Sequence, residues 1–488
     1  MIKGFNQKLE KWTAKDIVLN VLVYVLNVAL IMLIFSVAVY LENLSGTTAS
    51  TEKPLHFFFL LVLSVFVMFI FFMFEDRNFI RNPVNSEMIF LVIEITYIIC
   101  FVSTKYLDIY LRPLSLSALL ILFLVGGRAA TFVNLLTCIV VLLMDLFTGA
   151  SVQFGEYVSL VMGVSAGILG VWIMQHEYSR GKMLALSFVV SIPALICAIM
   201  SIVGFETETT LNSAIISIAS AVLSGPFTVC VFIVLLPIFE GIFQKVTRFK
   251  LAELTVHKAR LVRKLINVAP GTFNHSIVVS NIAEACATAI GDDALLARTC
   301  AYYHDIGKIR RPEYFGENQA DGKNPHNDLA PELSTNIIKS HTQDGYSYVL
   351  RNGLPKEIAD VCLQHHGTLP IIYFYDKAKK FTDGTVDITQ YCYPGPKPQT
   401  KIAAIIMIAD GCEAAARTIK NRSRENVMQV VRKIVNDRMA LGQFDECDIT
   451  IQELNIIIHT VVNNLTGIYH RRVEYPKVSL EGIDKDKL

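Results

Sequence analysis

Long apolar runs fill the first 240 residues of this chain, and they most constrain what it can fold into. Each is close to the roughly 20 residues that a helix needs to cross the hydrocarbon core of a bilayer. The eight runs lie at residues 17–40, 55–74, 88–107, 113–127, 129–148, 157–175, 184–205 and 214–240. With 53% hydrophobic and 18% charged residues, the composition is too apolar for an ordinary soluble protein. The sequence therefore predicts a polytopic bundle of transmembrane helices over residues 1–240, with the lipid bilayer as its surroundings.

The ends of the runs indicate how this bundle lies in the membrane. The first run is too long for a signal-peptide core and lacks a small-residue cleavage site, so we expect an uncleaved first span. Gly126-Gly127-Arg128 leaves two interpretations open for residues 113–148, a tight turn between two helices or a kink in one. With eight spans, the segments on one side carry 12 lysines and arginines and those on the other side 3. This asymmetry favours the turn and predicts a cell-membrane protein with both termini in the cytoplasm.

Residues 241–268 are expected to form a connector helix. Leucines recur in it at helical spacing among lysines and arginines, which is typical of a juxtamembrane helix attracted to anionic headgroups. The same pattern permits pairing with a second copy, so the sequence is compatible with a homodimer through the connector and the membrane region.

The remainder of the chain has the pattern of an all-helical cytosolic domain over residues 269–475, followed by a tail at 476–488. Asp292-Asp293 and Ser423 are typical helix starts, and Gly291, Gly353 and Gly442 typical helix ends. Two polar loops, 310–331 and 369–399, separate the helices, and the second is long enough to cover a site. Amphipathic patterns recur at residues 276–290, 293–305, 331–351, 355–365, 399–420, 424–440 and 450–468.

Ligand-type residues concentrate in this domain. His304 and Asp305 stand side by side at the end of an apolar helical pattern. Within about 110 residues of them lie His275, His341, the pair His365-His366, and Asp410. Each histidine also has an ordinary alternative, as a solvent-facing residue or as a cation at a helix C-terminus, where the helix dipole favours it. Asp410 ends an apolar run, and a buried carboxylate there would need a partner.

Together these seven side chains favour a metal centre. Imidazoles and carboxylates suit divalent first-row metals, and the 10 cysteines contain no CxxC pair that would indicate a thiolate site. Seven ligands exceed the needs of one ion, so we expect two ions about 3.5–4 Å apart, with Asp305 as the bridging carboxylate. A hydroxide held between such ions can attack a phosphoryl group in line. The domain shows no aromatic-basic pattern, so we expect no nucleic-acid polymer as partner.

Read in order along the chain, these motifs resemble those of the membrane-bound seven-transmembrane-receptor HD-domain family. Besides the isolated ligands His275, His341 and Asp410, the resemblance rests on the following segments: Ala301-Tyr302-Tyr303-His304-Asp305-Ile306-Gly307-Lys308, Glu317-Asn318-Gln319, Asn324-Pro325-His326, His365-His366-Gly367-Thr368 and Tyr393-Pro394-Gly395-Pro396-Lys397-Pro398.

This resemblance implies a function and a division of the ligands. Characterised members of the family hydrolyse cyclic di-AMP to the linear dinucleotide pApA at a di-metal centre, usually of iron or manganese. By resemblance, one metal would be held by His275, His304, Asp305 and Asp410, and the other by Asp305, His341, His365 and His366. Lys308 would face a phosphate. We expect further substrate contacts from Tyr303, His326 and Arg417.

One departure and two alternatives accompany this interpretation. Typical members carry a large extracellular domain after the first span, whereas residues 42–54 offer only a short segment here, so we expect any input to arrive through lipid, the spans or a partner. A membrane receptor that binds a nucleotide without hydrolysis remains an alternative, as does an HD hydrolase of cyclic di-GMP or (p)ppGpp. The complete ligand set favours an enzyme over the receptor, and the choice of cyclic di-AMP as substrate is what the resemblance implies.

Overall fold

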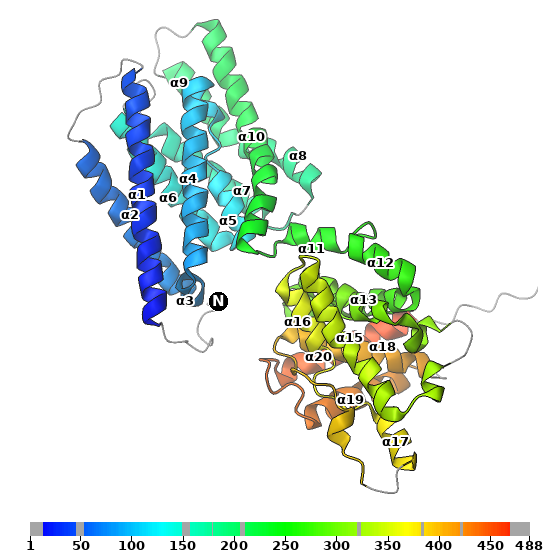
Figure 1. Ribbon diagram of the computed structural model, residues 1–488. Coiled ribbons are helices and arrows are strands. Elements are labelled where there is room, and N and C mark those ends of the chain that lie inside the picture. Colours follow the sequence, from blue (N-terminus) through cyan, green and yellow to red (C-terminus); the bar gives the residue numbers. More distant parts are fainter. Residues whose placement is uncertain are drawn as a thin grey trace, which may run out of the picture. The chain divides into compact units, whose positions relative to one another are not determined.

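The computed structural model describes residues 13–44, 53–148, 157–177, 179–204, 210–319, 324–381, 385–419 and 423–468. The chain divides into two compact units, Met1–Phe249 and Lys250–Leu488, and α11 contains the point of division. Apart from one isolated bridge between Pro370 and Cys392, every regular element in these ranges is a helix (Figure 1). The predicted all-α class is therefore confirmed. The predicted tail at 476–488 lies outside the described residues.

The first unit is a bundle of apolar helices. Six segments are long and apolar enough to cross a membrane, and they correspond to six of the eight predicted runs. The other two runs, 113–127 and 157–175, form shorter apolar helices. The elements in chain order are α1 (Ala14–Leu44), α2 (Lys53–Glu75), α3 (Arg77–Arg81), α4 (Pro83–Tyr106), η1 (Ile109–Leu111), α5 (Leu116–Leu124), α6 (Gly127–Thr148), α7 (Val158–Met174), α8 (Arg180–Val190), α9 (Ile192–Gly204) and α10 (Leu211–Phe243).

The stretch 113–148 folds as two helices, which settles the choice that the sequence left open. Gly126 separates α5 from α6 with a φ of +141°, a conformation that side-chain-bearing residues rarely adopt. The turn after α5 therefore depends on glycine. It brings α5 back against α6 in the interior of the bundle.

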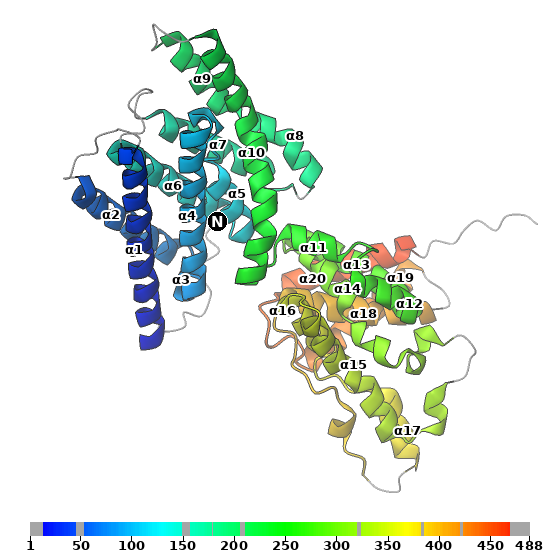
Figure 2. The same ribbon diagram turned by 45° about the horizontal axis from the view of Figure 1, so that its top comes forward.

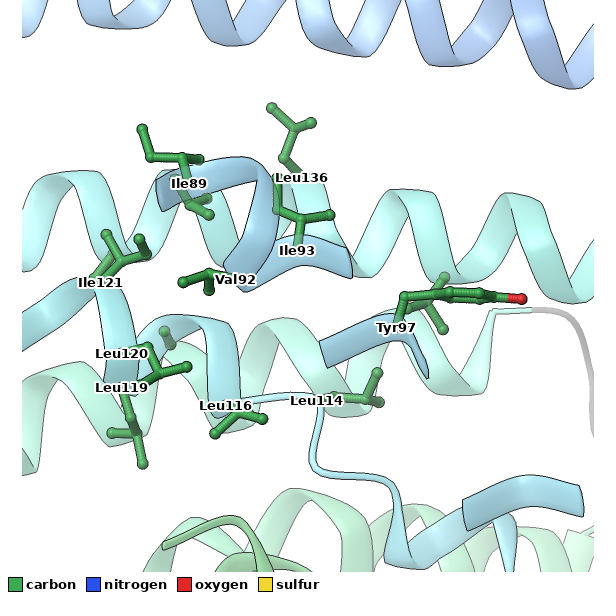
Figure 3. Packing of buried hydrophobic residues seen from close by; sticks show 14 of the residues in the cluster. Ile89, Val92, Ile93, Tyr97, Leu114, Leu116, Leu119, Leu120, Ile121 and Leu136 are labelled. Atoms are coloured by element: carbon green, nitrogen blue, oxygen red, sulfur yellow. The ribbon is translucent and has the colours of Figure 1, made fainter. Parts of the chain in front are cut away.

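Close packing holds this interior together. Ile89, Val92, Ile93 and Tyr97 of α4 are buried, as are the α5 side chains that surround them in Figure 3. Every residue of α5 except Phe123 is buried, so this short helix is enclosed by protein. Because lipid tails are as apolar as these side chains, the association depends on van der Waals contact more than on the hydrophobic effect.

Asp145, at the end of α6, is neutralised inside the bundle by Arg112. The Arg112 guanidinium donates to Asp145 Oδ1 and to Ser159 Oγ, both at 3.0 Å, and also to Thr104. The two charged side chains are only 1% and 8% exposed. This ion pair connects the segment before α5 to the end of α6 and the beginning of α7.

The second unit gathers its helices around α13 and α18. α13 packs against α14, α18 and α20 (Figures 1 and 2). All seven predicted helices are present, and α17 lies inside the predicted loop 369–399, where the sequence pattern did not show it. The elements are α11 (Arg248–Leu254), α12 (Arg260–Val268), α13 (Pro270–Ile290), α14 (Ala294–Tyr303), η2 (Ile306–Arg310), η3 (Pro312–Tyr314), η4 (Gly316–Asn318), η5 (Pro325–Asp328), α15 (Pro331–Arg351), α16 (Lys356–Gln364), α17 (Ile372–Phe381), η6 (Ile388–Tyr391), α18 (Lys401–Thr418), α19 (Arg424–Ala440) and α20 (Ile451–Ile468).

Removal of the carboxylate from the buried ion pair should destabilise the bundle. Asp145→Leu leaves the charge of Arg112 buried without its partner, and we expect the free energy of unfolding to fall by about 3–5 kcal/mol. Replacing both residues by leucine should recover most of this loss. Thermal unfolding in detergent measures the effect, and the labelling of the buried thiols Cys100 and Cys138 as they become exposed is the signal.

Arg128→Gln provides the matched control, because Arg128 pairs with Glu75 at the surface and is 63% exposed. Its loss should change the free energy of unfolding by less than about 1 kcal/mol. If the Asp145→Leu protein and the wild type have the same melting temperature, the Arg112–Asp145 pair does not stabilise the bundle.

Candidate metal centre

The His304-Asp305 pair is placed by the end of α14. Asp293 caps the beginning of this helix, since its carboxylate accepts from the backbone N–H of Leu296 at 3.0 Å. The helix ends at Tyr303, and its buried face continues into His304 and Asp305, which are 0% and 1% exposed. An ionisable pair is thereby carried into the interior of the domain.

Gly307 allows the segment after this pair to approach α15. A Cβ atom at position 307 would lie 1.9 Å from the backbone oxygen of His341 and would also collide with Gly345. The two backbones therefore meet at a distance that only glycine permits. The contact brings η2, and with it Asp305, against the middle of α15 where His341 lies.

All seven predicted ligands come together in two adjacent groups. Asp305, His341, His365 and His366 form one group, and His275, His304 and Asp410 form the other. Within each group, the potential ligand atoms lie within 4.8 Å of one another. These side chains come from α13, α14 and the residues after it, α15, the end of α16, and α18.

The carboxylate of Asp305 lies between the two groups. Its Oδ1 is 3.3 Å from Nε2 of His341 and 3.6 Å from Nε2 of His365. Its Oδ2 is 3.3 Å from Nε2 of His304 and 3.8 Å from Nε2 of His275. Each oxygen thus faces a different pair of histidines, which is the arrangement that a bridging ligand needs.

Backbone carbonyls fix the orientation of three imidazoles. Nδ1 of His304 donates to Ala301 O at 2.7 Å, and Nδ1 of His341 donates to Ile338 O at 2.5 Å. Nδ1 of His365 likewise donates to the carbonyl oxygen of Val361 at 3.1 Å. Because a carbonyl only accepts, each Nδ1 must carry the proton, and each Nε2 then presents a lone pair to the cluster.

These lone pairs are buried and meet other acceptors. Nε2 of His304 and Oδ1 of Asp305 have no hydrogen-bond partner among the described residues. Burial also lowers the pKa of His365 and, more strongly, that of His366, so both imidazoles are neutral electron-pair donors at neutral pH. Unpaired buried electron-pair donors such as Nε2 of His304 and Oδ1 of Asp305 fit a cation, and the combination of imidazoles and carboxylates suits a divalent first-row metal.

The charges of His275 and Asp305 depend on neighbouring charged groups. Burial alone would lower the pKa of His275, but hydrogen bonds to Asp410 and Glu413 raise it to about 10. Burial alone would raise the pKa of Asp305, whereas the ammonium of Lys308 holds it well below its usual range. Asp305 is consequently ionised at neutral pH, as a metal-binding carboxylate must be.

Glu413 is a functional residue that the sequence reasoning missed. Its Oε2 lies 2.6 Å from Nδ1 of His275, and its Oε1 accepts from Arg417 Nε at 2.6 Å. It therefore orients His275 as the backbone carbonyls orient the other imidazoles. Its position three residues after Asp410, on the same face of α18, is the signal that could have identified it.

The predicted substrate contacts lie in different surroundings. Lys308 Nζ is 2.6 Å from Asp305 Oδ2 and 2.9 Å from Glu317 Oε1, at the edge of the cluster. Arg417 pairs with Glu413. The Tyr303 hydroxyl donates to Leu254 O in the helical core, and Nε2 of His326 hydrogen-bonds to the backbone oxygen of Tyr314. Of the four, Lys308 is the one in direct contact with a predicted ligand.

The loop 369–399 returns to the cluster. Ile371 N donates to Tyr391 O at 2.8 Å, and Tyr393 N donates to Leu369 O at 3.0 Å, so the two ends of the loop are held together. Tyr393 stacks on the imidazole of His366 with 4.3 Å between ring centroids. This aromatic ring therefore lies against one of the two ligand groups.

The chain joins a polytopic helical bundle to a helical domain that gathers histidines and aspartates around one buried carboxylate. This combination defines a membrane-attached HD-domain protein. Residues 272–415 match the model of the HD domain. Residues 54–247 match the model described as a 7TM receptor with intracellular HD hydrolase, and all the apolar helices from α2 to α10 fall in this range. The two matches, in this order, identify residues 54–247 as a multi-pass membrane region of this kind and residues 272–415 as an HD domain.

Individual relatives agree with this assignment. The cyclic-di-AMP phosphodiesterase PgpH of Bacillus subtilis is 36% identical over 415 residues, which is 83% of this chain and 56% of the relative. The PgpH of Listeria monocytogenes is 43% identical over 305 residues, or 62% of this chain and 42% of the relative. This chain thus spans about half the length of these curated relatives.

Solved structures of the L. monocytogenes PgpH HD domain are also similar. The domain alone is 50% identical and covers 43% of this chain and 99% of that chain, with a TM-score of 0.41. The same domain in complex with cyclic di-AMP is 50% identical over 44% of this chain and 99% of that chain, with a TM-score of 0.42.

Adding one methyl group at Gly307 should disrupt the site. In Gly307→Ala the new Cβ would overlap backbone atoms of α15, which cannot move as a side chain can, so we expect a loss of about 1–3 kcal/mol in the free energy of unfolding. Gly316→Ala is the matched control, because a Cβ atom at position 316 would have no described atom within 4 Å. Thermal unfolding of the two variants measures the difference. Equal melting temperatures would contradict the close approach.

Proposed function

We propose that this chain is a membrane-anchored, metal-dependent phosphodiesterase that hydrolyses cyclic di-AMP to pApA and so controls the level of a second messenger. The observation that carries the proposal is the division of the Asp305 oxygens between two groups of buried imidazoles. Relatives that share 36% and 43% of the aligned residues are cyclic-di-AMP phosphodiesterases, which supports the choice of substrate.

The proposed metal assignment follows the two groups. His275, His304, Asp305 and Asp410 would hold one divalent ion, and Asp305, His341, His365 and His366 the other. Imidazole nitrogens and carboxylate oxygens suit divalent first-row metals, and iron and manganese are the proposed ones because the family resemblance implies them. When bound, two such ions would lower the pKa of a water molecule and neutralise the charge that develops on a phosphate group.

The reaction is the addition of water across one phosphodiester bond. A water oxygen forms a bond to phosphorus, the bond to the 3′ oxygen breaks, and that oxygen leaves as a hydroxyl group. Asp305 contributes a fixed negative charge between the ligand groups. Lys308, held between Asp305 and Glu317, is the proposed donor to a phosphate oxygen, because its ammonium lies 2.6 Å from the bridging carboxylate. Tyr303, His326 and Arg417 stay predictions as substrate contacts.

The proposal includes an orientation and a domain plan. Twelve lysines and arginines on one side of the spans against three on the other support cytoplasmic termini and a cytoplasmic HD domain. The spans would occupy residues 1–240, the connector 241–268 and the HD domain 269–475. A homodimer through the connector and the membrane region belongs to the same proposal.

Hydrolysis by the purified full chain tests the proposed function. In detergent with Mn²⁺, or with Fe²⁺ without oxygen, we expect conversion of cyclic di-AMP to pApA and little action on cyclic di-GMP or (p)ppGpp. Asp305→Asn should lower kcat by at least about 100-fold, as loss of an electrostatic contact to a transition state does. Metal analysis of the same samples should show fewer ions per chain in the variant.

The other outcomes separate the alternatives. Binding of cyclic di-AMP without turnover, in protein that contains metal, would favour the receptor. Faster cleavage of cyclic di-GMP or (p)ppGpp than of cyclic di-AMP would identify that nucleotide as the substrate instead. Wild-type turnover by Asp305→Asn would contradict the role of the bridging carboxylate.

Glu413 provides a test of the metal assignment that does not depend on activity. Glu413→Gln keeps a hydrogen-bonding group beside His275 but removes its negative charge, so we expect the Mn²⁺ affinity of one site to fall about 10–100-fold while the other is retained. Titration calorimetry measures both sites. Glu425→Gln, an exposed change on α19, is the control. Unchanged affinity at both sites would remove Glu413 from the centre.

A further inference from the structure

The basic side chain of Arg438 lies near the predicted ligand Asp410. Arg438 belongs to α19, a helix that contributes none of the predicted ligands. Arg438 extends from α19 toward α18, and its guanidinium rests against Gly411, the residue after Asp410. A Cβ atom at position 411 would lie 2.0 Å from an NH2 nitrogen of Arg438. The guanidinium therefore occupies space that exists because residue 411 is glycine.

Among the described residues, Arg438 differs from the other basic side chains at the cluster in having no carboxylate partner. Lys308 pairs with Asp305 and Glu317, and Arg417 pairs with Glu413. In the part of the chain that the structure describes, the Arg438 side chain hydrogen-bonds only to Ile434 O of its own helix, at 3.4 Å, and its buried Nε has no partner. A buried donor on a charged group is costly when it is left unpaired, so this arrangement calls for an anion.

The electrostatics of Arg438 agree with this interpretation. Burial lowers the pKa of its guanidinium, and the nearby Cys412, Asp410 and Asp437 offset that effect only in part. The group nevertheless stays protonated at neutral pH, because an arginine in a protein does not lose its proton. The side chain is thus a permanent, partly desolvated positive charge next to the ligand groups.

We propose that Arg438 binds the phosphate of the cyclic dinucleotide that is not being cleaved. This inference rests on the proposed function. The substrate carries two phosphates, and the ligand groups with their metals would take the one that reacts. The second phosphate needs its own cation, and the planar guanidinium offers paired N–H donors that match two phosphate oxygens. Of the described cations at the cluster, Arg438 is the one whose donors are not already taken by a carboxylate.

The first test compares two substrates in the full chain. For Arg438→Gln we expect the KM for cyclic di-AMP to rise about 10- to 100-fold, the loss typical of a hydrogen bond to a charged group, with a smaller change in kcat. The increase in KM for bis(4-nitrophenyl) phosphate, a diester with a single phosphate, should be several-fold smaller. Arg438→Lys should retain part of the affinity, because it keeps the charge without the paired donors.

A second variant reaches the same group without altering it. In Gly411→Ala the added methyl group would displace the end of the Arg438 side chain, which is flexible, and alanine is favourable within a helix. The KM for cyclic di-AMP should rise as it does in Arg438→Gln, with wild-type metal content and melting temperature. Arg432→Gln, an exposed change on the same helix, is the control and should leave both substrates unaffected.

Three results would overturn the assignment. An unchanged KM in both Arg438→Gln and Gly411→Ala would show that Arg438 does not bind substrate. Equal losses on the two substrates, or a loss of metal from the variants, would show a structural role. If the wild type cleaves bis(4-nitrophenyl) phosphate but not cyclic di-AMP, the proposed function fails and this inference falls with it. Wild-type cleavage of cyclic di-AMP with unaffected variants rejects Arg438 alone.

Discussion

The burial of one carboxylate, Asp305, is the interaction on which the candidate site depends. Moving an ionised carboxylate out of water costs several kcal/mol unless charges and hydrogen-bonding groups surround it. The chain supplies these from five directions, with Lys308 next along the same segment and imidazoles from α13, α14, α15 and α16. Such convergence demands close helix packing, and the contact between Gly307 and the backbone of α15 shows how close the packing is. The fold of the domain and the geometry of the site therefore depend on the same close packing of helices.

Features of the fold that are encoded locally could be predicted from the sequence. Apolar run length gave six of the long membrane helices, and helical periodicity gave seven helices of the cytosolic domain. The capping signals were equally local. Asp293 and Ser423 accept from the first turns of α14 and α19, and Gly291, Gly353 and Gly442 adopt the positive φ that ends a helix. The convergence of the seven candidate ligands was also predictable, because their residue types are rare together and their helices had been located.

Features that depend on distant partners could not be predicted. Hydropathy reports how apolar a segment is and not what surrounds it, so α5 resembled a membrane span although protein encloses it. α17 was hidden because prolines and glycines flank it in a polar loop. The roles of Glu413 and Arg438 come from contacts with His275 and Gly411. The spacing from Asp410 is the one sequence signal for Glu413, and no pattern near Arg438 in the sequence indicates its contact. Charge partners of this kind become visible only when the helices are packed.

Tyr303 illustrates how a residue within a motif can serve the fold. It adjoins His304, which made it a candidate for substrate contact, yet its side chain is 1% exposed and its hydroxyl donates to Leu254 O at 2.7 Å. Leu254 ends α11, the helix through which the chain enters the second unit, and the carbonyl oxygen of Leu251 in the same helix accepts from Thr299 of α14. Successive turns of α14 are thus hydrogen-bonded to the connector. Because α14 ends at the His-Asp pair, the position of the Asp305 carboxylate is set partly by the imidazoles around it and partly by the segment that joins the domain to the apolar bundle.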